Sequence, residues 1–181
     1  MTPWTFESLA AVDKQKLEEV LRTGTAPRFE ELEGYTYRGW NHEPISRLSG
    51  KKFKKVFYRR DGEPYGHNLQ IHQDCKGYGG EWQPKLKDGR PIEIGYYRVG
   101  LTEDESPKGP YDRYPHTGLL NYDVGRNAGL HVVLRVIRDF VVSPNPGDHG
   151  LVLGKAYLQF GFPWLSCFYS YFVLGHREPS E

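Results

Sequence analysis

From Gly34 onward the sequence is a succession of short runs rich in Tyr, Phe, Val and Ile, separated by Gly, Pro, Asn and Asp. Such runs predict β-strands, and no helical pattern lies between them. We expect about eight: Tyr35–Trp40, Lys52–Arg59, Asn68–His72, Ile92–Val99, Gly118–Tyr122, Val132–Val142, Leu151–Phe160 and Phe168–Gly175. Strands without intervening helices favour antiparallel hairpins, and closing the sheet removes its edges. The sequence therefore predicts a mainly β protein, an antiparallel barrel of about eight strands.

Residues 1–33 are predicted to form an N-terminal helical segment. Between Thr5 and Leu21 apolar residues recur at helical spacing, and Thr5 and Asp13 are suitable N-caps. A second, short helical stretch is expected from Arg28 to Leu32. Because 181 residues suit a single domain, this segment and the barrel, residues 34–181, are expected to form one structural unit.

The stretch from Ala156 to Gly175 has no charged side chain and is about as long as a membrane helix. The Gly-Phe-Pro step at Gly161 to Pro163 interrupts it, so two strands joined by a turn are predicted rather than stable membrane insertion. Two cysteines, Cys75 and Cys167, and an N-terminus without an apolar leader indicate reduced thiols in a cytoplasmic protein.

The charge balance does not favour a nucleic-acid partner. Lys plus Arg number 24 and Asp plus Glu number 23, so no broad field of one sign is expected. The basic run from Lys51 to Arg60 could contact phosphates or anionic lipid headgroups. The favoured interpretation is a strand at the edge of the sheet, where outward lysines prevent aggregation.

Several segments resemble a family of small bacterial proteins named for a G-x-W-x-G motif. The segments are Phe29 to Pro44, Gly50-Lys-Lys-Phe53, Ile137-Arg-Asp-Phe140, Leu153-Gly-Lys155 and Tyr171-Phe-Val-Leu174 with Arg177. Tyr37-Arg38-Gly39 stands where the family would have Trp-x-Gly. The resemblance implies a calycin-like or lipocalin-like barrel and no particular reaction.

An eight-stranded barrel can enclose one small ligand, which is lined by alternate residues of each strand. In Leu130 to Val142 the alternation places Val132, Val136 and Arg138 on a nearly apolar face. If that face points inward, Arg138 is an interior cation that could bind an acidic ligand group. If it points outward, the barrel packs there against the N-terminal helix.

Other candidate ligand-binding residues are aromatic or polar side chains on the closing strands and at the start of the barrel: Lys155, Tyr157, Gln159, Tyr169, Tyr171 and Trp40. A largely apolar pocket with few polar anchors needs such side chains, although an outer sheet surface carries them as often. The predicted function is therefore binding of a small hydrophobic or amphipathic molecule, lipid-like or polyketide-like.

A cofactor-independent isomerase or cyclase is the alternative, and the sequence leaves open whether the protein is an enzyme. Its candidate acid and base groups are His116, Tyr122 and Asp123. The spacing of His67, His72 and Cys75 places the two histidines on opposite strand faces, so no metal site is predicted.

No cofactor is predicted either. Haem held by His67, His131 or His176 is a less favoured alternative. Cys167, which follows Ser166 in an aromatic run, is expected to be buried rather than nucleophilic.

Overall fold

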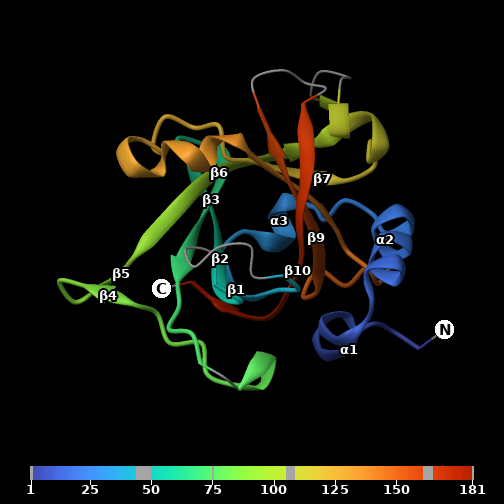
Figure 1. The fold of residues 1–181 in the computed structure, drawn as a ribbon, viewed down its shortest axis with the longest axis horizontal. Helices are drawn as coiled ribbons and strands as arrows, with labels where there is room; N and C mark the ends of the chain where they lie inside the picture. Colours follow the sequence, from blue (N-terminus) through green and yellow to red (C-terminus); the bar gives the residue numbers. More distant parts are fainter. Residues whose placement is uncertain (1, 44–49, 75, 105–108, 161–164, 181) are drawn as a thin grey trace.

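The protein is described by a computed structural model covering residues 2–43, 50–74, 76–104, 109–160 and 165–180. Its main feature is a closed barrel of eight antiparallel strands (Figure 1). The strands are β1 (Tyr35–Asn41), β2 (Lys52–Arg60), β3 (Glu63–Gln70), β6 (Glu93–Leu101), β7 (Gly118–Asn121), β8 (Ile137–Val142), β9 (Val152–Gln159) and β10 (Ser166–Pro179). Each pairs with the next along the chain, and β10 pairs with β1. The predicted fold class is confirmed.

A separate two-stranded hairpin, β4 (Leu86–Lys87) with β5 (Arg90–Pro91), extends from the connection between β3 and β6 (Figure 1). Short 3-10 helices occur at η1 (Gly77–Gly79), η2 (Thr102–Asp104), η3 (Gly109–Arg113) and η4 (Gly129–Val136).

Two predicted strands begin well away from the observed ones, and the predicted Phe168–Gly175 strand extends further, from Ser166 to Pro179. β3 begins at Glu63, because Asp61 and Gly62 have φ of 53° and 86° and form a tight hairpin turn with β2. The run starting at Val132 was expected to be extended, yet it belongs to η4 until Val136, and β8 begins only at Ile137. Its apolar residues lie across one end of the barrel instead of in the sheet.

The N-terminal helices are α1 (Phe6–Ala11), α2 (Lys14–Thr23) and α3 (Phe29–Leu32). Both predicted N-caps are confirmed: Thr5 Oγ1 accepts from the Ser8 amide at 3.1 Å, and Asp13 Oδ1 accepts from the Lys16 amide at 2.9 Å. α1 packs on β10 and α2 on β9, both on the outside of the barrel (Figure 1).

Two hydrophobic clusters result from this arrangement. The outer cluster joins Leu17 and Leu21 of α2 to Phe140 and Val142 of β8. The inner cluster fills one half of the barrel, where Leu32 of α3 packs with Tyr37, Phe57, Tyr97, Val141 and Leu174. β8 and β9 are therefore buried on both faces, because each face is covered.

The basic run does not lie at a sheet edge, since the barrel is closed and β2 pairs with both β1 and β3. Lys52 and Lys55 are each 2 % exposed. The edge-strand interpretation is therefore wrong.

Cys167 is a free, exposed thiol, so its predicted burial is also wrong. Cys75 and the Gly161–Pro163 turn lie outside the described residues. Of the helices described, none is both long enough and apolar enough to cross a bilayer.

Candidate functional site

The half of the barrel that the inner cluster leaves unfilled holds a cavity of about 740 Å³. Its walls are mainly apolar and include Phe53, Leu69, Ile94, Ile137, Leu158 and Phe172. Val133 and Val136 of η4 line it as well, because η4 lies over this end of the barrel. The volume suits a drug-sized organic molecule, for which pockets run from roughly 300 to 1,000 Å³.

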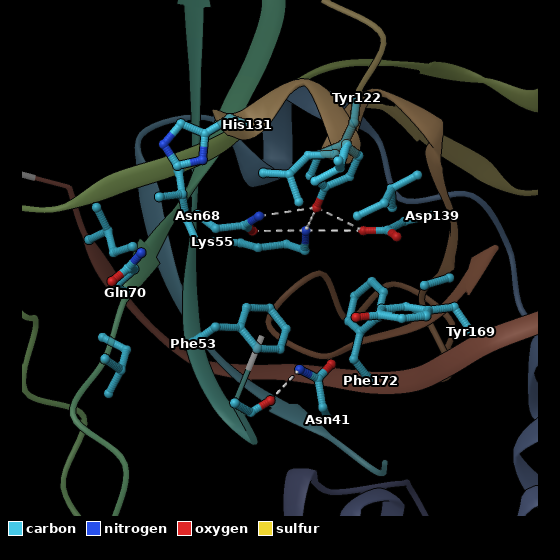
Figure 2. A pocket seen from close by; sticks show the side chains of 18 of the residues that line it. Asn41, Phe53, Lys55, Asn68, Gln70, Tyr122, His131, Asp139, Tyr169 and Phe172 are labelled. Atoms are coloured by element: carbon cyan, nitrogen blue, oxygen red, sulfur yellow. Dashed lines mark hydrogen bonds and ion pairs between the residues drawn. The ribbon is translucent and has the colours of Figure 1, made fainter. Parts of the chain in front are cut away.

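Among the polar side chains that line the cavity, four lie next to the inner cluster and contact one another: Lys55, Asn68, Tyr122 and Asp139, here called the polar cluster (Figure 2). Gln70, Lys85 and His131 also line the cavity and have no hydrogen bond to this cluster. Lys55 Nζ donates to Tyr122 Oη at 2.5 Å, to Asn68 Oδ1 at 3.0 Å and to Asp139 Oδ2 at 3.1 Å. Tyr122 Oη donates to the same Asp139 oxygen at 3.0 Å and accepts from Asn68 Nδ2 at 3.2 Å. The four side chains form one connected network.

Strand alternation turns these side chains inward. Lys55 on β2 and Asn68 on β3 are direct cross-strand partners, Asp139 is on β8, and Tyr122 immediately follows β7. Gly95 on β6 makes room for the network. It has φ of 58°, its carbonyl accepts from Asn68 Nδ2, and a Cβ there would lie 2.8 Å from that nitrogen.

The surroundings of Lys55 suit an ammonium group. Its three acceptors match the three N–H groups of that form, and the rings of Tyr97 and Phe172 have centroids 4.6 and 5.2 Å from Nζ. Burial lowers the pKa of Lys55, and the negative charge of Asp139 raises it in part. Burial and the Asp139 charge both raise the pKa of Tyr122 well above its usual range.

Of the predicted ligand-binding and proton-transfer residues, Tyr169 and Tyr122 lie at the cavity. Tyr169 is on the inner face of β10 towards the open half of the barrel, and Tyr122 is part of the polar cluster (Figure 2). Tyr169 was predicted to contact ligand and Tyr122 to transfer a proton.

The other candidate ligand-binding residues lie on the outer face of the barrel. Lys155 and Tyr171 donate to Glu18 Oε2 of α2 at 2.7 and 2.6 Å. Arg138 Nε donates to Tyr111 Oη at 3.1 Å, so the nearly apolar face of β8 points outward. The remaining three contact outer residues: Tyr157 packs on Phe140, Gln159 accepts from Tyr111, and Trp40 packs on Tyr78.

The two other candidate proton-transfer residues are also outside the barrel. His116 Nε2 lies 3.1 Å from the Leu21 carbonyl oxygen. Asp123 pairs with Arg135 and is 45 % exposed. Neither side chain lines the cavity.

The histidines weighed for haem are dispersed. His131 on η4 lines the cavity, His67 lies between the rings of Tyr58 and Tyr96, and His176 pairs with Glu7. Within the described part of the chain, no three His, Cys, Asp or Glu side chains converge as a metal site would require.

Sequence reasoning missed Lys55, Asn68 and Asp139. Lys55 was read as one of a solvated basic run, although alternation along β2 places it on the same face as Phe53 and Phe57. A lysine between two phenylalanines on one strand face was the available signal. Asp139 carried a similar signal, because the apolar residues Ile137 and Val141 flank it on the same face of β8.

The fold and the cavity define the protein as a closed eight-stranded antiparallel β-barrel with a polar network inside it. No family model matches the chain, and no curated protein or solved structure shows significant similarity to it.

Proposed function

We propose that the barrel binds a small, largely apolar molecule in its cavity. The observation that carries the proposal is a cavity of about 740 Å³ with mainly apolar walls and a hydrogen-bonded cluster of four polar side chains on one side. This combination is what recognition of an organic ligand requires: the walls supply affinity, and the polar groups fix orientation.

The polar cluster itself favours a binding role over a purely structural one. Burying an ammonium and a carboxylate costs desolvation that their attraction seldom exceeds, so well-packed apolar residues would stabilise the barrel at least as well. The side chains of Lys55 and Asp139 are 2 % and 4 % exposed. Their position beside the cavity, rather than inside the packed half, fits orientation of a ligand.

A lipocalin-like carrier or sensor is the particular form we favour, and the resemblance to the G-x-W-x-G proteins agrees with it. The first test is native mass spectrometry of the purified protein beside its denatured mass. A retained mass of a few hundred daltons is expected for the native form. The chemical class of that molecule would follow from its extraction and fragmentation.

A cavity-filling variant localises the binding. Leu158→Trp places an indole on the cavity wall, whereas Tyr157→Phe changes the adjacent residue on the outer face. We expect Leu158→Trp to lose the retained molecule and to lower the affinity for methyl nonyl ether at least tenfold, while Tyr157→Phe keeps both. Equal binding by both variants would contradict the proposal.

A second candidate function is a cofactor-independent isomerase or cyclase acting in the same cavity. The observation that favours it is Asp139, a carboxylate that faces the cavity beside a tyrosine and a lysine and could accept a proton. If the protein is such an enzyme, the molecule retained by wild type and the molecule retained by Asp139→Asn would be isomers. The two would have equal mass but would separate by chromatography. An identical molecule from both proteins would favour the carrier.

A further inference from the structure

The hydrogen bonds of the polar cluster determine which ligand group can join it. Each member has a fixed number of donors and acceptors, so the positions already filled can be counted. Lys55 uses its three N–H groups on Tyr122, Asn68 and Asp139. It has no hydrogen left for a ligand.

The hydroxyl of Tyr122 likewise has no hydrogen-bonding position left. Its hydroxyl donates its single hydrogen to Asp139 Oδ2 and accepts from Lys55 and Asn68. Asn68 Nδ2 donates to Tyr122 Oη and to the Gly95 carbonyl oxygen. The cluster therefore presents no free donor to the cavity.

Asp139 has an unused hydrogen-bond acceptor. Both of its hydrogen bonds reach Oδ2, as the two dashed lines to Asp139 in Figure 2 show. Oδ1 accepts no hydrogen bond from any residue that the structure describes, although the side chain is 4 % exposed and lines the cavity. Oδ1 is not among the fully buried side-chain atoms without a partner, so a donor in the cavity can reach it, and a ligand that covered it without supplying a donor would incur a cost.

We infer that the ligand, if the cavity binds one as proposed above, carries a neutral hydroxyl group that donates a hydrogen bond to Asp139 Oδ1. A carbonyl, ether or carboxylate would find no donor in the cluster. The charges of Lys55 and Asp139 already balance, so a cationic ligand group would add an uncompensated positive charge near the Lys55 ammonium. A neutral hydroxyl meets both requirements, and the apolar walls accommodate a hydrocarbon body.

Four ten-carbon probes test the inference by isothermal titration calorimetry: decyl alcohol, its isomer methyl nonyl ether, decanoate and decylammonium. Decyl alcohol and methyl nonyl ether have the same atoms, but only the alcohol can donate a hydrogen bond. We expect decyl alcohol to bind about tenfold or more tightly than the ether, as a hydrogen bond to a buried charged group implies. Decanoate and decylammonium should both bind more weakly than the alcohol.

The variant Lys55→Met/Asp139→Leu removes both charges together and supplies the control. It should bind the alcohol and the ether with equal affinity, while still binding the ether at least as well as wild type. Asp139→Asn, which keeps the shape of the side chain, should reduce the preference for the alcohol in the same direction.

The outcomes separate this inference from the proposed function. If the ether binds to wild type as tightly as the alcohol, or if decanoate or decylammonium binds most tightly, the hydroxyl inference is overturned and the cavity still binds apolar molecules. If the alcohol preference persists in the double variant, Asp139 is not the acceptor. If none of the four probes binds and no molecule is retained on purification, the proposed function fails as well.

Discussion

Lys55 Nζ lies 3.1 Å from Asp139 Oδ2 inside the barrel, although the two residues are 84 positions apart in the chain. One is on β2 and the other on β8, two strands that do not pair with each other. The contact therefore spans the interior of the barrel. It brings opposite charges to the boundary between the packed half and the cavity.

Removing one member of this ion pair should destabilise the protein more than removing both. Lys55→Met leaves an uncompensated buried carboxylate, and Asp139→Leu leaves an uncompensated ammonium, so each should lower the free energy of unfolding by about 3–5 kcal/mol. The double variant should lose less stability than either single variant, because it buries no unpaired charge and leaves only the neutral Tyr122 hydroxyl and Asn68 amide without a partner. Urea denaturation of the three variants measures the difference. Additive losses in the double variant would show that the two charges are not coupled.

Tyr122→Phe should weaken the same network. The change leaves Lys55 and Asn68 each without one acceptor and Asp139 without one donor, which is expected to cost about 1–3 kcal/mol. Tyr169→Phe is the matched control, because no described residue hydrogen-bonds to that hydroxyl. It should change the unfolding free energy by less than about 0.5 kcal/mol. Thermal and urea denaturation would compare the two.

Gly154→Ala should disturb the cavity wall. A Cβ at Gly154 would lie 2.0 Å from the ring of Phe172, so the ring must move from its place beside the cavity. The expected cost is about 1–3 kcal/mol of unfolding free energy. Gly100→Ala on β6, with open space at its Cβ position, should cost almost nothing. Similar stability of the two variants would show that Phe172 can shift freely.

Acid should weaken the attachment of α2 to the barrel. Burial raises the pKa of Glu18, but hydrogen bonds from Lys155, Tyr171 and Tyr114 lower it more, from 4.5 to about 2. A lowered carboxyl pKa stabilises the fold above pH 4.5, and this contribution is lost as the pH falls towards 2. We expect a loss of about 2 kcal/mol, reduced for partial solvent exposure.

Glu18→Gln provides the comparison for that pH dependence. The variant should be less stable than wild type at pH 7, and the difference should shrink as the pH is lowered from 4.5 to 2. Urea denaturation across this range would measure it. A stability difference that stays constant with pH would show that the Glu18 charge does not stabilise the contact of α2 with β9 and β10.

Much of the fold could be predicted because its signals are local. Strand-forming runs between turn residues indicated the barrel, and Thr5 and Asp13 marked the starts of α1 and α2 through hydrogen bonds within one helical turn. The run from Val132 was assigned wrongly for the same reason. Its residues have a strand-like composition, but contacts across the barrel opening hold them in η4.

The sequence by itself determined the succession of strands, the helix caps and a mainly β fold. The tertiary structure decided which face of each strand points inward. Alternation reveals the inner face only when the outer face is exposed to water. Here α1 and α2 cover the outside of β8 to β10, so both faces of β8 are buried and mostly apolar. For that reason Arg138, Lys155 and Tyr171 lie outside, and only closure of the barrel brings Lys55 to Asp139.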